Sequence, residues 1–334
     1  NRATSLIKLS GSTVSKVNQE EDVNVDKGIN VSTAASTITT FTSAADSRLD
    51  LSANLTITNA FSLGARTMIL SGSSTLGGGK ITLDNANSLI QITAGCTISS
   101  DVAFGANSAS GKGLDINSSC TISGALTTSA DAIIDVASGQ TLTYSGAAFA
   151  VAANTLNILG GGTIANSNAI TFTSGELDVD ANNTISGALT ISGDATFDIG
   201  TNTLTYSGAA IDVGGNTLTI DGTGTITNTN DIQLNNANSL LKLTGATISK
   251  VKQSADAASG KGIDVATNNS TITTFTSAGQ SRIKLGKNLT ITNAFNLGAK
   301  TMILNGTQTI DGGKITLNNA DSLIQVTENC TIDN

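Results

Sequence analysis

The sequence predicts an all-β fold, a three-sided parallel β-helix (β-solenoid) of about 16 coils with ~21 residues per coil. Three observations predict it. The composition is poor in charge and free of proline, a threonine recurs at a short and regular interval, and each interval contains three alternating apolar segments. We expect residues 1–334 to form a single continuous β-solenoid.

The composition favours an elongated repeat and excludes several functional classes. The 334 residues include 35 glycines, no proline and no histidine, and only 13% are charged. Proline would remove a hydrogen bond from a parallel ladder, which explains its absence. Without histidine there is no imidazole for a catalytic triad or a pH switch. The net charge of −8 argues against nucleic acid as a partner, and no apolar run approaches the ~18 residues of a membrane span, so we expect no membrane insertion.

Two long internal repeats are present. Residues 5–100 match residues 239–334 without a gap, at an offset of 234 residues. Residues 121–164 match residues 184–226, at an offset of 62 to 63 residues. A solenoid survives duplication only when whole turns are inserted, so each offset should contain a whole number of coils.

A short period underlies both repeats. Each short unit opens with a threonine followed by Ile, Leu or Val, at spacings of 19 to 24 residues. The opening residues are Thr13, Thr37, Thr56, Thr75, Thr97, Thr121, Thr141, Thr163, Thr184, Thr203, Thr225, Thr247, Thr271, Thr290, Thr309 and Thr331. The 234-residue offset contains eleven of these steps and the 63-residue offset contains three. This agreement indicates that one short unit is one coil.

Each coil is predicted to contain three short strands. In the coil that opens at Thr184, Ile185 belongs to the first strand, Leu189–Ile191 to the second and Phe197–Ile199 to the third. Apolar and polar residues alternate in these segments, which is the period of a β-strand, and no segment has helical periodicity. Gly, Asn, Ser and Ala lie between them, where tight corners are expected.

Two further expectations concern the coiling and the ends. Parallel crossovers are overwhelmingly right-handed, so we expect a right-handed solenoid. Neither end has a recognisable capping sequence. We therefore expect a window of a longer repeat array, or a subunit that stacks end to end.

Four aspartates on the third strand form a candidate cation strip. Asp115 and Asp135 lie one coil apart, and so do Asp178 and Asp198. Carboxylates ~5 Å apart repel by about 1 kcal/mol in water, and Ca²⁺ could relieve that repulsion. The alternatives are a solvated acidic strip and the aspartate cluster of a polysaccharide-cleaving enzyme. Neighbouring aromatic and arginine residues are lacking, which disfavours catalysis.

Threonines on the first strand form a possible ligand face. The Thr-x-Thr pairs are Thr141 and Thr143, Thr203 and Thr205, and Thr225 and Thr227. A flat threonine array on a β-helix resembles ice-binding proteins. Alternatively, threonine is simply a favourable exposed strand residue that forms ladders. Interruptions at Gly77 and Ala165 favour the second interpretation.

Two cysteines form a possible disulfide. Cys96 and Cys120 open consecutive coils, and stacking in register would place their Cα atoms ~4.8 Å apart, within the range that a disulfide requires. Alternatively, both remain reduced as small buried residues. Cys330 is the counterpart of Cys96 in the second copy of the long repeat. An oxidised pair would imply an extracellular or periplasmic location.

Three insertions occur at equivalent corners, at residues 18–28, 105–113 and 252–262. Two of them contain Ala-Ser-Gly-Lys-Gly, at residues 109–113 and 258–262. A Gly-Lys-Gly segment can bind phosphate where a helix follows, but no helix is predicted here. We interpret the segment as a glycine-rich bend with a solvated lysine.

The coils rich in Thr, Asn, Gly and Ser, such as Asn-Thr-Ile-Ser-Gly-Ala-Leu at residues 183–189, support a resemblance at the level of a protein class. From Ser5 to Asn334 the chain resembles the β-helical stalks of bacterial surface adhesins, namely autotransporter passengers and filamentous-haemagglutinin-like proteins. The resemblance implies a secreted, surface-displayed rod that serves structure or attachment.

The leading functional hypothesis is a structural extracellular β-solenoid that forms a surface fibre or appendage, without catalysis or an obligatory cofactor. Its expected partner is itself, by end-to-end or lateral association. The alternative is an adhesin stalk that binds glycan or a host surface. A polysaccharide-active enzyme and an ice-binding protein are less favoured by the residues.

Overall fold

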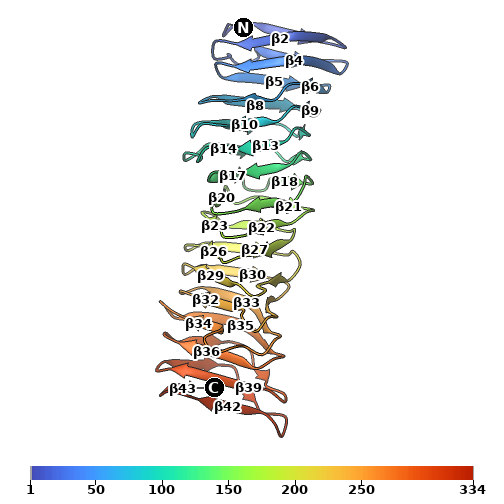
Figure 1. Cartoon of the computed structure of the whole chain (residues 1–334). Coiled ribbons are helices and arrows are strands. Elements are labelled where there is room, and N and C mark those ends of the chain that lie inside the picture. Colours follow the sequence, from blue (N-terminus) through green and yellow to red (C-terminus); the bar gives the residue numbers. More distant parts are fainter. Residues whose placement is uncertain (1, 334) are drawn as a thin grey trace. The chain divides into compact units, whose positions relative to one another are not determined.

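The computed structural model describes residues 2–333 and confirms the predicted fold class (Figure 1). The described residues form parallel strands without a helix, arranged as a β-solenoid of about 15 turns with ~22 residues per turn. The chain divides into two compact units, residues 1–170 and residues 171–334, and each is described by itself. Each full turn contributes strands to three sides, which we call sides A, B and C.

In the first unit, strands of successive turns pair in parallel on each side. Side A contains β1 (Leu6–Leu9), β3 (Gly28–Val31), β5 (Ser47–Leu51), β8 (Thr67–Gly72), β11 (Leu89–Ile92), β14 (Gly113–Ile116), β17 (Ala132–Val136) and β20 (Thr155–Leu159). Side B contains β2 (Thr13–Gln19), β4 (Ser36–Ser43), β6 (Leu55–Ile57), β9 (Thr75–Gly78), β12 (Thr97–Ile98), β15 (Cys120–Ile122), β18 (Thr141–Tyr144) and β21 (Thr163–Asn166). Side C contains β7 (Phe61–Ser62), β10 (Ile81–Leu83), β13 (Val102–Phe104), β16 (Leu126–Thr128) and β19 (Phe149–Val151), and β22 (Ile170–Phe172) begins at the last residue of this unit.

The second unit repeats this arrangement. Side A contains β23 (Glu176–Val179), β26 (Ala195–Asp198), β29 (Thr217–Asp221), β32 (Leu240–Leu243), β34 (Gly262–Val265), β36 (Ser281–Leu285), β39 (Thr301–Gly306) and β42 (Leu323–Val326). Side B contains β24 (Asn183–Ile185), β27 (Thr203–Tyr206), β30 (Thr225–Asn228), β33 (Thr247–Gln253), β35 (Ser270–Ser277), β37 (Leu289–Ile291), β40 (Thr309–Gly312) and β43 (Thr331–Asp333). Side C contains β25 (Leu189–Ile191), β28 (Ile211–Asp212), β31 (Ile232–Leu234), β38 (Phe295–Asn296) and β41 (Ile315–Thr316).

The alternating apolar residues line the interior of each unit. On side A, Ile90 pairs with Leu114, which pairs with Ile134, and all three side chains are buried. Burying an aliphatic side chain of this size contributes roughly 1.5–3 kcal/mol. The polar residues between them, such as Gln91 and Asp115, form the outer surface. The alternation that predicts the strands therefore also decides which side chains are available for function.

Two tyrosines close corners between sides B and C. The Tyr144 hydroxyl donates to the Ala147 carbonyl and accepts from the Leu126 amide at 3.0 Å. The Tyr206 hydroxyl donates to the Ala209 carbonyl at 2.6 Å and accepts from an amide of the preceding turn. Both rings are buried. These are equivalent positions of the shorter repeat, so the duplication preserved a complete corner.

The structure shifts the register of side B at several steps. Aligning the unit-opening threonines would place Thr121 beside Thr141, whereas the structure pairs Thr121 with Thr143. In the same way, Thr184 pairs with Thr205. A shift of two residues leaves the same side chains facing inward, so the apolar pattern cannot detect it. These shifts also explain why a turn contains ~22 residues where the sequence suggested ~21.

Candidate functional site

An acidic ladder on side A of the second unit contains two of the predicted residues. Asp178 on β23 lies opposite Asp198 on β26, and Asp198 lies opposite Asp221 on β29. All three alternate with buried residues, so their carboxylates point outward. In the first unit, Asp115 on β14 lies opposite Asp135 on β17. Each pair of neighbours is separated by one turn of the solenoid.

Sequence reasoning missed Asp221 because it assumed that Asp198 would face Thr219. The structure places Thr219 opposite Thr196, and Asp198 opposite Asp221. Similarly, counting outward positions along the sequence would place Asp135 opposite Asn157, whereas the structure places it opposite Leu159. Both differences are two-residue shifts, which exchange one outward residue for the next outward residue.

Burial and the crowding of negative charge raise the pKa of two carboxyls. Burial, followed by the charges of Asp180, Asp198 and Glu176, raises the pKa of Asp178 to about 6. Burial, followed by the charge of Asp115, also raises the pKa of Asp135. The ionised ladder is therefore under electrostatic strain, which a proton, a cation or a basic partner surface would relieve.

Neighbouring polar groups hold several carboxylates in place. Asp115 accepts hydrogen bonds from Gln91 at 2.8 Å and from Asn117 at 2.9 Å. Asp198 accepts from the Gly200 amide at 2.8 Å, and Asp221 accepts from the Gly222 amide at 2.9 Å. Among residues 2–333, no group of three or more His, Cys, Asp or Glu side chains has a geometry that could hold a metal ion. Calcium binding at Asp115, Asp135, Asp178 and Asp198 stays a prediction.

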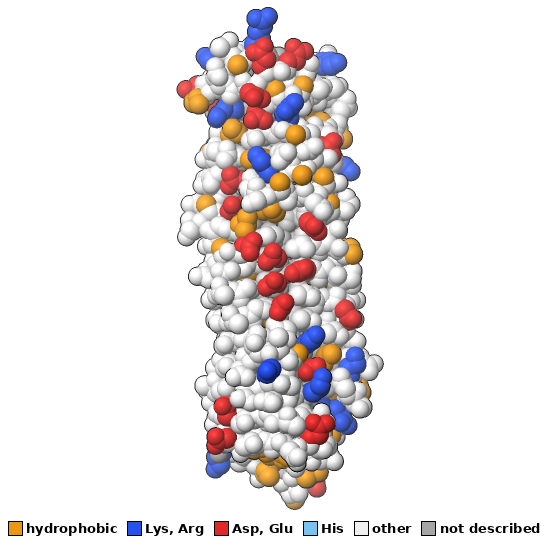
Figure 2. Space-filling view, turned by 90° about the vertical axis from the view of Figure 1, so that its left-hand side faces the viewer, with side chains coloured by type: hydrophobic (Ala, Val, Ile, Leu, Met, Phe, Trp, Pro, Cys, Tyr) orange, Lys and Arg blue, Asp and Glu red, His pale blue; other side chains and the backbone are white. Residues whose placement is uncertain are grey.

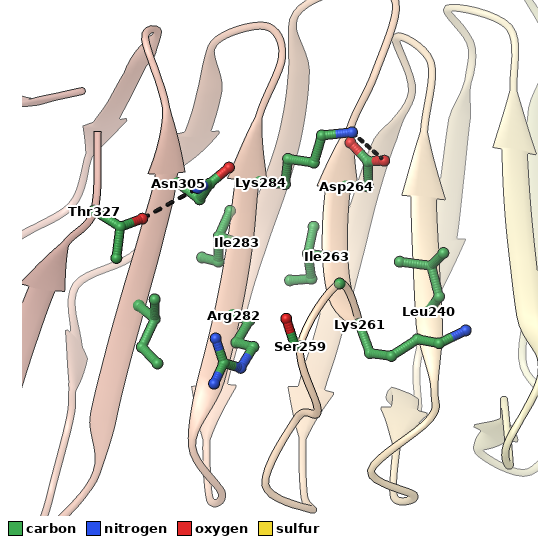
Figure 3. A pocket seen from close by; sticks show the side chains of 12 residues that line it. Leu240, Ser259, Lys261, Ile263, Asp264, Arg282, Ile283, Lys284, Asn305 and Thr327 are labelled. Carbon is green, nitrogen blue, oxygen red and sulfur yellow. Dashed lines mark hydrogen bonds and ion pairs between the residues drawn. The ribbon is translucent and has the colours of Figure 1, made fainter. Parts of the chain in front are cut away.

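A basic groove lies on side A a few turns further along the second unit (Figure 3). Its volume is about 470 Å³, and it is bordered by β32, β34, β36 and β39 together with the insertion at residues 252–262. Its lining residues include Leu240, Lys261, Ile263, Asp264, Arg282, Lys284 and Ile303. Lys284 Nζ lies 3.2 Å from Asp264 Oδ2, and the two side chains form a salt bridge. Arg282 Nε donates to the Ala257 carbonyl at 2.8 Å.

Glycine at position 262 brings the inserted loop against side A. Gly262 has a φ of +97°, a left-handed conformation that favours glycine. A Cβ atom at this position would also collide with the Arg282 carbonyl. The Gly-Lys-Gly segment is thus a bend, and it places Lys261 at the edge of the groove, where Figure 3 shows its side chain extending toward Leu240.

The first unit contains a counterpart of this groove, of about 420 Å³. Leu6, Lys27, Arg48 and Ile69 line it, at the positions equivalent to Leu240, Lys261, Arg282 and Ile303. Its polar residues differ, because Asn30 and Asp50 occupy the positions of Asp264 and Lys284, and the Asn30 amide donates to Asp50 at 2.6 Å. Sequence reasoning missed both grooves. Comparing charge position by position between the two long repeats would have drawn attention to them.

The predicted threonine face forms ladders on side B. In the second unit, Thr203, Thr225, Thr247, Thr271 and Thr290 pair successively. Thr205 pairs with Thr227 in a parallel column. In the first unit, Thr141 pairs with Thr163, whereas Thr143 pairs with Ala165. The second-unit ladder therefore joins five of the predicted unit-opening threonines, and it ends at Asp311, which pairs with Thr290 in place of Thr309.

Cys96 and Cys120 lie side by side at a corner of side B. The pairing of Thr97 with Thr121 makes the two cysteines neighbours, and both are buried free thiols in the structure. Burial raises the pKa of Cys96 to about 11, and burial together with Cys96 raises the pKa of Cys120 to about 12. Both cysteines line a shallow pocket of about 200 Å³ with Thr141 and Thr143. The structure thus joins two of the predicted sites, and their proposed disulfide and ligand roles stay predictions.

Comparisons with models of protein families, with curated proteins and with solved structures find no match. Among residues 2–333 there is no helix long and apolar enough to cross a membrane. Interpretation of function therefore rests on the residues and their geometry.

Proposed function

We propose that this chain is a structural extracellular β-solenoid that forms a surface fibre or appendage and performs no catalysis. The observation that carries the proposal is the preservation of turn geometry through duplication. On side B, Thr13 pairs with Thr37 in the first copy of the long repeat, and Thr247 pairs with Thr271 in the second. Duplicating whole turns lengthens a solenoid without changing how each turn is built.

The physical properties of the turns suit such a role. Each turn adds ~4.8 Å along the solenoid axis and hydrogen-bonds its backbone to its neighbours. The interior is aliphatic, with edge-to-face aromatic pairs such as Phe172 and Phe197, whose centroids lie 5.2 Å apart. A ladder of this kind resists local opening because few backbone groups are free for water or a protease.

Three features support an extracellular location. The resemblance to adhesin stalks implies export, and Cys96 and Cys120 lie next to each other where an oxidising compartment could join them. The outer surface is dominated by Thr, Ser and Asn, which suits a solvated stalk.

Surface exposure can be tested on the organism that makes the chain. Intact cells are labelled with an antibody against the folded protein and examined by immunogold electron microscopy, with permeabilised cells as the control. We expect gold along surface appendages before permeabilisation. Labelling that appears only after permeabilisation would overturn the proposal.

A further inference from the structure

Charge is segregated within the second unit. Residues 171–236 contain eight acidic residues and no Lys or Arg, whereas residues 239–300 contain eight Lys or Arg and two Asp. The acidic residues are Glu176, Asp178, Asp180, Asp194, Asp198, Asp212, Asp221 and Asp231. The basic residues are Lys242, Lys250, Lys252, Lys261, Arg282, Lys284, Lys287 and Lys300. Figure 2 shows a run of red side chains near the middle of one face, and further down the same face a group of mostly blue side chains with a few red ones among them.

On side A this segregation follows the strand order. Three consecutive strands, β23, β26 and β29, contribute Glu176, Asp178, Asp198 and Asp221, which we call the acidic half-face. In the next three strands, β32 contributes Lys242 and β36 contributes Arg282 and Lys284, and the inserted loop contributes Lys261; we call these four residues the basic half-face. Asp264 on β34 lies between Lys242 and Lys284 and pairs with Lys284, so this surface has four positive charges and one negative charge. The two half-faces adjoin where Thr219 pairs with Lys242.

We propose that two copies of this chain associate side by side through side A of the second unit, in antiparallel orientation, with the acidic half-face of each copy on the basic half-face of the other. A two-fold axis between β29 and β32 would place β29 opposite β32 of the second copy, β26 opposite β34, and β23 opposite β36. Both halves of this isologous contact form at once, because each copy supplies one acidic half-face and one predominantly basic half-face. This inference rests on the proposed structural role, and the partner that it assigns is a second copy of the chain.

The two half-faces are electrostatically suited to each other. Burial, followed by repulsion from neighbouring carboxylates, raises the pKa of Asp178 above its ordinary value. The Lys284 side chain is 63% exposed, so its ammonium group can reach a second copy. Residues 171–236 contain no Lys or Arg. Cations from another copy would therefore stabilise the ionised ladder.

The size of the contact predicts its strength. Six strands spaced ~4.8 Å apart, each about 15 Å wide, offer roughly 400 Å² per copy. This is smaller than the roughly 800 Å² per partner of a standard stable interface. The association should therefore be weak, reversible and sensitive to salt, since exposed charges are screened over ~8 Å at physiological ionic strength.

The counterpart surface in the first unit provides a matched control. Lys8 and Lys27 occupy the positions of Lys242 and Lys261. However, Asp50 replaces Lys284, and residues 5–66 contain five Lys or Arg against six Asp or Glu. This counterpart therefore has less positive charge than the basic half-face, because only three of the four basic positions, Lys8, Lys27 and Arg48, are kept.

Sedimentation velocity on the full chain tests the proposal, at about 10 mM and about 1 M salt. We expect dimers at low salt and monomers at high salt. K242E/K261E should weaken dimerisation by about tenfold or more, whereas K8E/K27E should leave it unchanged. D198K/D221K should also be monomeric, and mixing it with K242E/K261E should restore a one-to-one dimer because both half-faces are then complementary again.

Asp198 and Asp221 also accept backbone hydrogen bonds, so circular dichroism must confirm that the acidic variant is folded. If it is not, the salt dependence of the unmodified chain and the two lysine variants still decide the question. A chain that stays monomeric at low salt, or equal effects of K242E/K261E and K8E/K27E, would overturn the proposal. Cell-surface fibres assembled from chains that show no such dimer would remove this contact and leave the structural role intact.

Discussion

The two copies of the long repeat differ in what duplication preserved. Their interiors are alike in packing: Phe41 and Phe61 pack edge to face with centroids 5.2 Å apart, and Phe275 and Phe295 do so at 5.3 Å. Their surfaces differ in charge. Residues 5–66 have five basic and six acidic side chains, whereas the equivalent residues 239–300 have eight basic and two acidic ones.

This difference shows which positions the solenoid constrains. An inward residue is enclosed by the turns above and below it, so a change in its size disturbs both neighbours. An outward residue contacts chiefly the adjacent outward residues of its ladder, so its charge can change at little cost to folding. The second copy has gained positive charge at such positions, next to a segment that has only negative charge. The inward residues are constrained by the fold, whereas the outward residues are free to differ in charge between the two copies.

The largest expected effect comes from deleting an interior ring in either copy. Phe41→Ala and Phe275→Ala should each destabilise the protein by about 3–5 kcal/mol, because each removes an aromatic pair and leaves a cavity. Hydrogen exchange of the surrounding strands measures this locally in both variants. The account requires the two losses to agree within about 1 kcal/mol, and a large inequality would show that the interiors are not equivalent.

The second-largest effect on stability should come from Gly262, the first residue of β34, and from its counterpart Gly28. Gly262→Ala and Gly28→Ala should each destabilise by about 1–3 kcal/mol, because both positions have positive φ and lie against the carbonyl of the following turn. Gly260→Ala is the control, since a Cβ there meets open space and only the backbone strain remains. Urea unfolding measures all three, and a control as destabilised as Gly262→Ala would contradict the steric explanation.

The acidic ladder should affect stability with a definite dependence on pH. The pKa of Asp178 is about 6 in the folded chain and 3.8 in its ordinary state, so the folded chain holds this proton more tightly. The stability that proton binding contributes is therefore fully present below pH 3.8 and is lost as the pH rises through 6. Asp178→Asn should therefore stabilise the chain by about 1 kcal/mol at pH 7.5, after allowance for solvent screening, and by almost nothing near pH 3.5. Thermal unfolding at both pH values measures this. Destabilisation at pH 7.5 would mean that the carboxylate is paired favourably.

The smallest effect should follow from restoring the first copy's polar pair in the second. The double variant D264N/K284D replaces the salt bridge, whose lysine is 63% exposed and whose aspartate is 18% exposed, by the Asn–Asp arrangement of Asn30 and Asp50. Stability should change by less than about 0.5 kcal/mol, because exposed ion pairs contribute little. Chemical unfolding tests this expectation. A loss of several kcal/mol would show that the surface is as constrained as the interior.

The sequence predicts the fold class because one physical signal, alternation in strands that recur every turn, specifies it. It predicts less about the outer surface. Shifts of two residues, such as Thr121 onto Thr143, preserve every inward residue and so leave no trace in the apolar pattern. A shift of two residues is also the reason why Asp221 was not predicted as part of the acidic ladder. The basic groove was not predicted because Lys261 enters it from an inserted loop. The position of such a loop depends on packing, which the periodicity of the strands does not encode.

Electron microscopy of native fibres, with power spectra from their images, tests the central claim most directly. The account predicts continuous filaments with a layer line at ~4.8 Å, the spacing between successive turns along the fibre axis. Preparations that contain only separate particles, with no filament and no such layer line, would contradict a structural role built on stacked turns.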